Sequence, residues 1–141
     1  MLLASSAFGG DARLWIKGPE QGVRTGDSFT MTVILDTTQP VYAYQFEIAC
    51  DDPSVLEIKG VEAGADGFVT ASSVDEASGM LKVNGFVAEN GVSGTGLRFL
   101  TLKVVAKARG SAGIMVTPVI LSDASGNSIV VTGARTRIQV D

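Results

Sequence analysis

The feature that most constrains the fold is a regular succession of short apolar runs separated by turn residues. The segment YQFEIACDDPSVLEI, Tyr44 to Ile58, is representative, because alternating apolar and polar residues are interrupted by an acidic turn with a proline and then resume. Such alternation is typical of half-buried strands. From Ala12 onward these runs recur about every 8–12 residues, and no stretch carries the 3.6-residue apolar stripe of a helix.

The pattern predicts an all-β fold, a closed sandwich of two sheets with about nine strands. The glycine-rich segment NGVSGTG (residues 90–96) matches no phosphate-binding motif and is interpreted as a flexible loop, and TTQP (residues 37–40) as a turn. The expected strands are Arg13–Lys17, Ser28–Asp36, Val41–Cys50, Val55–Val61, Phe68–Ser72, Leu81–Ala88, Leu97–Lys107, Gly113–Leu121, and Ile129–Val131 running on to Arg135–Val140.

One local signal conflicts with this strand assignment. Asn84-Gly85 lies between the apolar runs of LKVNGFVA, and Asn-Gly is the strongest short cue for a hairpin turn. The flanking pieces would be very short strands, so a continuous strand with a glycine bulge is favoured over a hairpin.

Composition excludes several classes of function. The 141 residues correspond to one domain with a net charge of −4, and the 11 basic residues are scattered rather than clustered, which disfavours nucleic acid and anionic membranes as partners. No apolar run approaches the ~20 residues of a membrane-spanning helix. The absence of histidine removes the commonest general base and metal ligand, so no catalytic residue is expected and the chain is not predicted to be an enzyme.

The remaining candidates for chemistry are better explained by structure. Cys50 is the single cysteine, which excludes an internal disulfide, and it is interpreted as a buried hydrophobe. The Asp123–Asn127 segment lacks the ligand spacing of an EF-hand and is interpreted as a turn, and Asp51-Asp52 as a solvated corner. No metal site and no cofactor are therefore predicted. Trp15 has an uncertain orientation, and the sequence does not support a platform of aromatic residues that stack on sugars.

Residues 1–11, MLLASSAFGGD, are expected to be a flexible leader or the remnant of a signal peptide, and residues 12–141 to form the domain. The apolar start followed by small residues favours a secreted or extracellular protein, which could be attached to the cell surface through a larger parent protein.

The chain resembles a cohesin domain, the dockerin-binding module of scaffolding proteins in cellulosome-type assemblies. The segments that carry the resemblance are GDSFTMTVILD, VYAYQFEIACDDPSVLEIKGVEAG, GMLKVNGFVAENGVSGTG, LRFLTLKVVAKARGSAGIMV and ILSDASGNSI, and together they cover about residues 12–141. The resemblance implies a nine-stranded jelly-roll sandwich and is nearer to the simpler, type I-like cohesins, since no helix is inserted between strands.

In cohesins the polar outer side of one sheet is the binding surface. On Val41–Cys50, alternation places Ala43, Gln45, Glu47 and Ala49 on that side, whereas Tyr44, Phe46, Ile48 and Cys50 share the core side. Family members often carry Asn and Asp where Ala43 and Gln45 stand, so recognition by this chain is expected to differ there.

The neighbouring binding strand would be Leu81–Ala88, with Lys82, Asn84 and Phe86 pointing outward. An exposed Phe86 would be a binding hot spot of about 2 kcal/mol or more. The alternative is a kinked strand with Phe86 in the core. Four further partner contacts are expected: Glu89 and Asn90 as polar groups, Gly91 and Gly94 as points of close backbone approach. Ile129 is expected to add an apolar contact at the edge.

The resemblance therefore implies a non-catalytic recognition module that binds a dockerin whose own loops carry calcium. A carbohydrate-binding module and a structural or adhesive surface domain remain alternatives, because one fold hosts many functions. Weak homodimerisation through the flat outer sheet is also left open.

Overall fold

The computed structural model describes residues 12–19, 21–66, 68–75, 80–86 and 91–141; for 68–75, 86 and 118 only the backbone is described. These residues form eleven strands and no helix. The strands are β1 (Ala12–Lys17), β2 (Ser28–Val41), β3 (Ala43–Cys50), β4 (Leu56–Ala63), β5 (Phe68–Asp75), β6 (Met80–Phe86), β7 (Val92–Ala106), β8 (Gly110–Ser122), β9 (Ser128–Ile129), β10 (Val131–Thr132) and β11 (Ala134–Val140).

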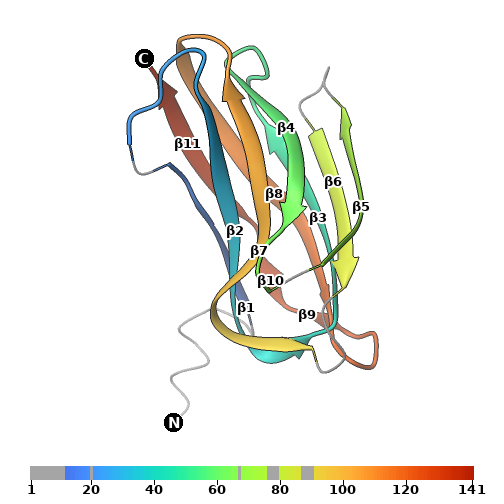
Figure 1. The fold of residues 1–141 in the computed structure, drawn as a ribbon. Helices are drawn as coiled ribbons and strands as arrows, with labels where there is room; N and C mark the ends of the chain where they lie inside the picture. Colours follow the sequence, from blue (N-terminus) through green and yellow to red (C-terminus); the bar gives the residue numbers. More distant parts are fainter. Residues whose placement is uncertain (1–11, 20, 67, 76–79, 87–90) are drawn as a thin grey trace.

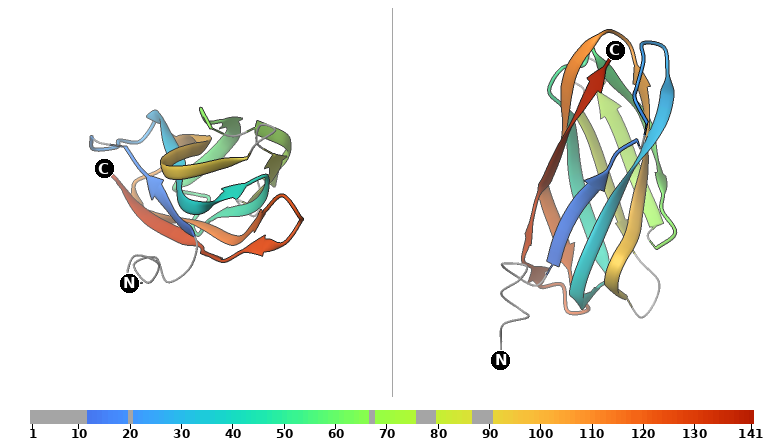
Figure 2. Two further views of the ribbon diagram at one scale, coloured as in Figure 1. Left: turned by 90° about the horizontal axis from the view of Figure 1, so that it is seen from below. Right: turned by 90° about the vertical axis from the view of Figure 1, so that its left-hand side faces the viewer.

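The strands form two sheets that pack face to face, as Figures 1 and 2 show. One sheet has the order β10-β1-β2-β7-β4, and the other has the order β11-β8-β3-β6-β5 with β9 paired to β8. The predicted all-β sandwich of two sheets is confirmed. The last predicted strand divides into β9, β10 and β11, so the described residues contain more strands than the nine expected.

Strand β3 shows how the sequence positions its side chains. Its sequence AYQFEIAC alternates, and the alternate residues Tyr44, Phe46, Ile48 and Cys50 are all buried, while Gln45 between them is exposed. This confirms the predicted division of β3 into a core side and an outer side. Each large apolar side chain removed from water in this way contributes about 1.5–3 kcal/mol to folding.

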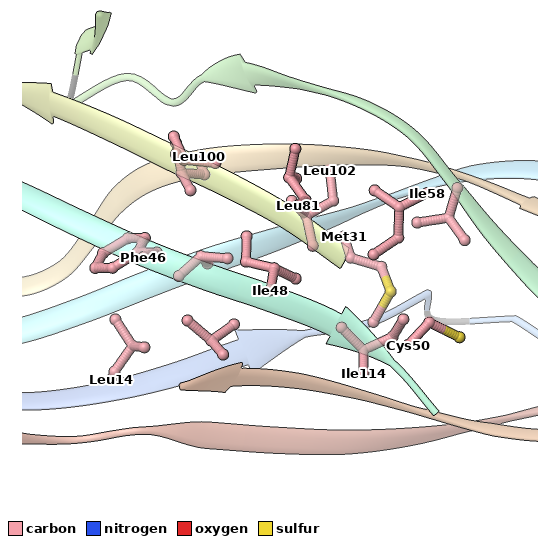
Figure 3. Packing of buried hydrophobic residues seen from close by; sticks show 14 of the residues in the cluster. Leu14, Met31, Phe46, Ile48, Cys50, Ile58, Leu81, Leu100, Leu102 and Ile114 are labelled. Carbon is pink, nitrogen blue, oxygen red and sulfur yellow. The ribbon is translucent and has the colours of Figure 1, made fainter. Parts of the chain in front are cut away.

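The core fills the space between the two sheets, as Figure 3 shows. Tyr44 and Phe46 of β3 pack against Phe99 of β7. The centroid of the Tyr44 ring lies 5.0 Å from that of Phe46 and 5.2 Å from that of Phe99. Burial raises the pKa of Tyr44 to about 12, so its phenol stays neutral at physiological pH. Cys50 is also buried, which confirms its interpretation as a small core residue.

Two segments predicted as a turn and a loop are instead parts of long, irregular strands. Strand β2 continues through TTQP to Val41, and β7 begins at Val92 within the glycine-rich segment. The two strands pair there, Thr37 with Gly94 and Val41 with Val92, with a register shift between these pairs. The hydroxyl of Thr37 donates a hydrogen bond to the carbonyl of Gln39 at 2.8 Å, a local bond of the kind that also forms turns. In these two segments, turn-forming residues therefore indicate a bulged strand rather than a turn or a loop.

Asn84-Gly85 lies inside β6, so the hairpin alternative is wrong and the continuous strand is confirmed. The pairing of β6 with β3 runs without a shift from Met80 to Phe86. The irregularity lies on the other neighbour, because β5 shifts register between Val69 and Ala71 opposite Gly85 and Asn84.

The acidic corner after β3 has two different parts. Asp52 caps the turn by accepting a hydrogen bond from the backbone N–H of Ser54 at 3.1 Å. Asp51 instead ties β3 to its sheet: it accepts a bond from the Gly113 N–H at 2.7 Å and one from Arg137 Nη2 at 3.0 Å. Asp51 is exposed and Asp52 is half-buried, so the corner is only partly solvated, and Asp51 is a structural link rather than a freely solvated carboxylate.

Candidate functional site

The outer surface of β8, β3 and β6 brings the predicted polar residues together. Gln45 lies at the centre, because it pairs with Asn84 of β6 on one side and with Ile120 of β8 on the other. Directly paired residues of antiparallel strands point to the same side of the sheet. We define the open face as the surface that carries Ala43, Gln45, Glu47, Lys82, Asn84 and Ile120.

The open face is of mixed polarity. Gln45, Lys82 and Asn84 are exposed, and Ala43 and Glu47 are half-buried beside them. Glu47 pairs directly with Lys82, so opposite charges stand at facing positions, an arrangement that contributes roughly 0.2–1 kcal/mol in a sheet. The centre of the face is thus nearly neutral and offers amide donors and acceptors.

Ile120 is a residue of this face that the sequence reasoning missed. It is 45% exposed, and within the described part of the chain only Ile120 and Val130 are large apolar residues with such exposure. Alternation from the buried Leu121 could have found it. The signal is weakened by a register shift between β3 and β8, which falls between the pairs Phe46–Val119 and Ile48–Val116.

The β11 end of the same surface is basic. Ala49 of β3 pairs with Met115 of β8, which pairs with Arg135 of β11, so Arg135 lies on the same side as the open face. Arg137 is held by Asp51 and also donates a hydrogen bond to the Ser111 hydroxyl at 2.9 Å. Arg135 is exposed and extends the surface with a positive charge.

The hydrogen bond from the Gly113 N–H, together with the nearby Arg137 guanidinium, lowers the pKa of Asp51 below its ordinary value. Both partners favour the ionised carboxylate. The contact therefore stabilises this corner of the sheet at neutral pH.

Phe86 occupies the register position next to Ala43 on one side and Phe68 on the other. Its side chain lies outside what the structure describes, and so do Glu89 and Asn90. The roles expected for these three residues stay predictions.

A close contact within the fold, rather than the predicted approach to a partner, explains why residue 91 is a glycine. Its φ is +69°, and a Cβ added there would lie 2.7 Å from Cε1 of Tyr42. The close approach is thus made to Tyr42 of the same chain and explains glycine without any partner. Gly94 has a φ of +133° and is exposed, with no comparably close neighbour, so its expected approach to a partner stays a prediction.

Ile129 was expected to contact a partner at the surface, but this prediction is wrong because the side chain is buried. Ile129 is only 3% exposed, because β9 pairs with β8 at Leu121 and directs Ile129 into the core. The exposed apolar residue at that edge is its neighbour Val130, at 62%.

Within the described residues, no group of three or more His, Cys, Asp and Glu side chains is placed to hold a metal ion. The same residues include no helix that is both long and apolar enough to cross a bilayer.

A family model described as the cohesin domain matches residues 15–140, nearly the whole chain. The chain therefore belongs to the cohesin domain family, and the resemblance read from the sequence is confirmed. No sequence among the curated proteins matches significantly.

Solved structures with the same fold include several cohesins. A non-cellulosomal cohesin from the archaeon Archaeoglobus fulgidus is similar with a TM-score of 0.76 and 18% identity, over 93% of this chain and 91% of the other. A cohesin module of a family 33 glycoside hydrolase from Clostridium perfringens gives a TM-score of 0.80 with 12% identity, over 94% and 98%. A type I cohesin–dockerin complex from Clostridium thermocellum gives 0.71 with 13% identity, over 94% and 96%. The likeness confirms the jelly-roll sandwich expected from the family.

Proposed function

We propose that this domain is a non-catalytic, type I-like recognition module that binds a dockerin through the open face. Membership of the cohesin family supports the class of function. Among the structural relatives, the type I cohesin from Clostridium thermocellum is in complex with a dockerin.

The observation that carries the proposal is the row Asn84–Gln45–Ile120 across three adjacent strands. It combines two exposed amides with an exposed aliphatic side chain on a surface fixed by the backbone pairing of β3 with β6 and β8. Protein interfaces commonly have an apolar anchor surrounded by polar groups that exclude water. A rigid sheet suits a partner that docks without rearranging it.

Phe86 and the loop that follows β6 extend this proposed interface. Phe86 pairs in register with Ala43 at the end of the open face, so an outward Phe86 would add a second apolar anchor. Glu89 and Asn90 follow it in sequence and would supply hydrogen bonds at the rim.

The calcium of such a complex belongs to the dockerin, whose loops it would order, and this chain contributes only the docking surface. We place the domain outside the cell, as part of a larger scaffolding or surface protein, because that is the setting implied by cohesins of cellulosome-type assemblies.

Calorimetric titration with type I dockerins, in calcium and after calcium chelation, tests the proposal. Binding should require calcium and should weaken when Gln45 or Asn84 is replaced by alanine. Thr101→Ala is the matched control, because Thr101 lies on a strand of the five-stranded sheet. If none of the three variants changes calcium-dependent binding, the open face is not the binding site, although the domain still binds a dockerin.

A further inference from the structure

The sheet opposite the open face carries a groove that the proposed function does not use. The groove has a volume of ≈ 650 Å³ and crosses β1, β2 and β7, and Gly18, Pro19 and Gln21 also contribute to its lining. Its main side chains are Trp15, Lys17, Thr30, Thr32 and Arg98. We propose that this groove binds an acidic saccharide, with a sugar ring stacked on Trp15 and the carboxylate of a uronic acid bound by Arg98.

The register aligns the two groups that would recognise such a ligand. Trp15 of β1 pairs with Ile34 of β2, and Ile34 pairs with Arg98 of β7. The indole and the guanidinium therefore belong to one row, on strands about 10 Å apart. Ile34 between them is 5% exposed and gives the groove an apolar floor.

The chemistry of the lining matches a charged sugar. The described lining residues include two basic side chains, Lys17 and Arg98, and no acidic one. Thr30, Thr32 and Gln21 add two hydroxyls and an amide, which can donate to and accept from sugar hydroxyls. A guanidinium binds a carboxylate through two parallel hydrogen bonds, so the charge selects an acidic sugar over a neutral one.

Two carboxylates bind the backbone of the β7 residues that line the groove. Asp66 accepts a hydrogen bond from the Arg98 backbone N–H at 2.9 Å, and Asp36 accepts one from the Gly96 N–H at 2.7 Å. These bonds fix the irregular part of β7. The backbone that carries Arg98 is consequently fixed before a ligand binds, and such a preformed site favours binding.

The indole Nε1 of Trp15 gives a second indication of a ligand. This atom is buried and has no hydrogen-bond partner among the described residues. A buried donor without an acceptor is rare in native proteins, so a ligand hydroxyl that reached the edge of the indole ring would satisfy it.

Trp15 is the only tryptophan of the chain, so its fluorescence reports on this groove alone. The whole domain should be titrated with oligogalacturonate and, in parallel, with a neutral cello-oligosaccharide of equal length. We expect a saturable change in emission with the acidic sugar and at least ~10-fold weaker binding of the neutral one. No saturable change, or equal binding of both sugars, would overturn the proposal.

Three variants locate the site. Arg98→Met should weaken binding of the acidic sugar by ~10-fold, whereas Arg135→Met, on the opposite sheet, should leave it unchanged. Trp15→Phe keeps an apolar ring and should retain weak binding in calorimetry, whereas Trp15→Ala should abolish it, provided that thermal melting shows both variants folded. Equal affinities of Arg98→Met and the unaltered protein would contradict the site. Dockerin binding should be unaffected by the substitutions of Arg98 and Trp15, so either proposal can fail alone.

Discussion

Gln45 of β3 and Ile120 of β8 face each other as register partners, and they place an exposed amide beside an apolar side chain that is 45% exposed. Asn84 continues the row on the other side of Gln45. The pair results from two alternation patterns that direct Phe46 and Leu121 into the core and leave these neighbours outside.

Truncating Ile120 tests its role as an anchor of the open face. Ile120→Ala should weaken dockerin binding by about 10-fold or more, because the buried aliphatic contact is lost while the polar rim remains. The fold should be unaffected, since the side chain is exposed. Calorimetry measures the affinity, and circular dichroism verifies the fold.

Val130→Ala is the matched control for Ile120. Val130 is also an exposed aliphatic residue, but it lies between the short strands β9 and β10. The Val130→Ala variant should bind the dockerin with the same affinity as the unaltered domain. A loss of affinity as large in Val130→Ala as in Ile120→Ala would mean that general apolar exposure, rather than the open face, drives binding.

Gly91→Ala should strongly destabilise the domain. The left-handed conformation costs an alanine about 1–2 kcal/mol, and the clash with the Tyr42 ring adds about 1–3 kcal/mol, so urea unfolding should show a loss of about 2–5 kcal/mol. Gly126 separates the two costs, because its φ is +83° and a Cβ there would meet nothing within 4 Å. Gly126→Ala should lose only the conformational part. Equal losses in both variants would show that the contact with Tyr42 is not limiting.

Asp51 should make stability depend on pH in the acidic range. Its pKa is lower in the folded state than in the unfolded state, so the ionised carboxylate stabilises the fold above the unfolded pKa. That contribution is lost as the pH falls through the folded pKa. Asp51→Asn should therefore melt at a lower temperature than the unaltered domain at neutral pH, and the difference should shrink towards acidic pH. A difference that is the same at every pH would exclude the charge as its cause.

Arg137→Gln refines this prediction. The hydrogen bond from Gly113 is the largest cause of the lowered pKa of Asp51, and Arg137 is a smaller one. The arginine variant should consequently lose less stability than Asp51→Asn in the same thermal melts. A larger loss would make the ion pair the dominant interaction.

Cys50 should resist thiol reagents while the domain is folded. The thiol is buried, and its desolvation raises its pKa, so little thiolate is available for reaction. Labelling should accelerate in urea in parallel with unfolding. A Cys50→Ala variant that carries Ser125→Cys in an exposed turn should react fast without denaturant. Fast labelling of native Cys50 would mean that the edge of the core opens readily.

The strands and the core side of β3 could be predicted from the sequence because the alternation is regular where one face is buried. The residues Gln45, Lys82 and Asn84 were found in this way, and the structure exposes all three. Periodicity does not indicate which outer side of the sandwich meets a partner, and only the resemblance to cohesins implies this one.

Other features could not be predicted, because local composition and tertiary pairing disagree. TTQP and the segment after Gly91 carry turn residues, yet the pairing of β2 with β7 extends both into bulged strands. Ile120 follows a register shift that interrupts alternation, and Ile129 lies in a strand too short for alternation to show its direction. The groove beside Trp15 depends on three strands and a loop that are distant in sequence.

Docking through the open face is best tested by NMR mapping of backbone amide shifts as a calcium-loaded dockerin is added to the labelled domain. The shifted and protected amides should gather on β8, β3 and β6, around Gln45, Asn84 and Ile120. Changes confined to the five-stranded sheet, with these three residues unmoved, would contradict it.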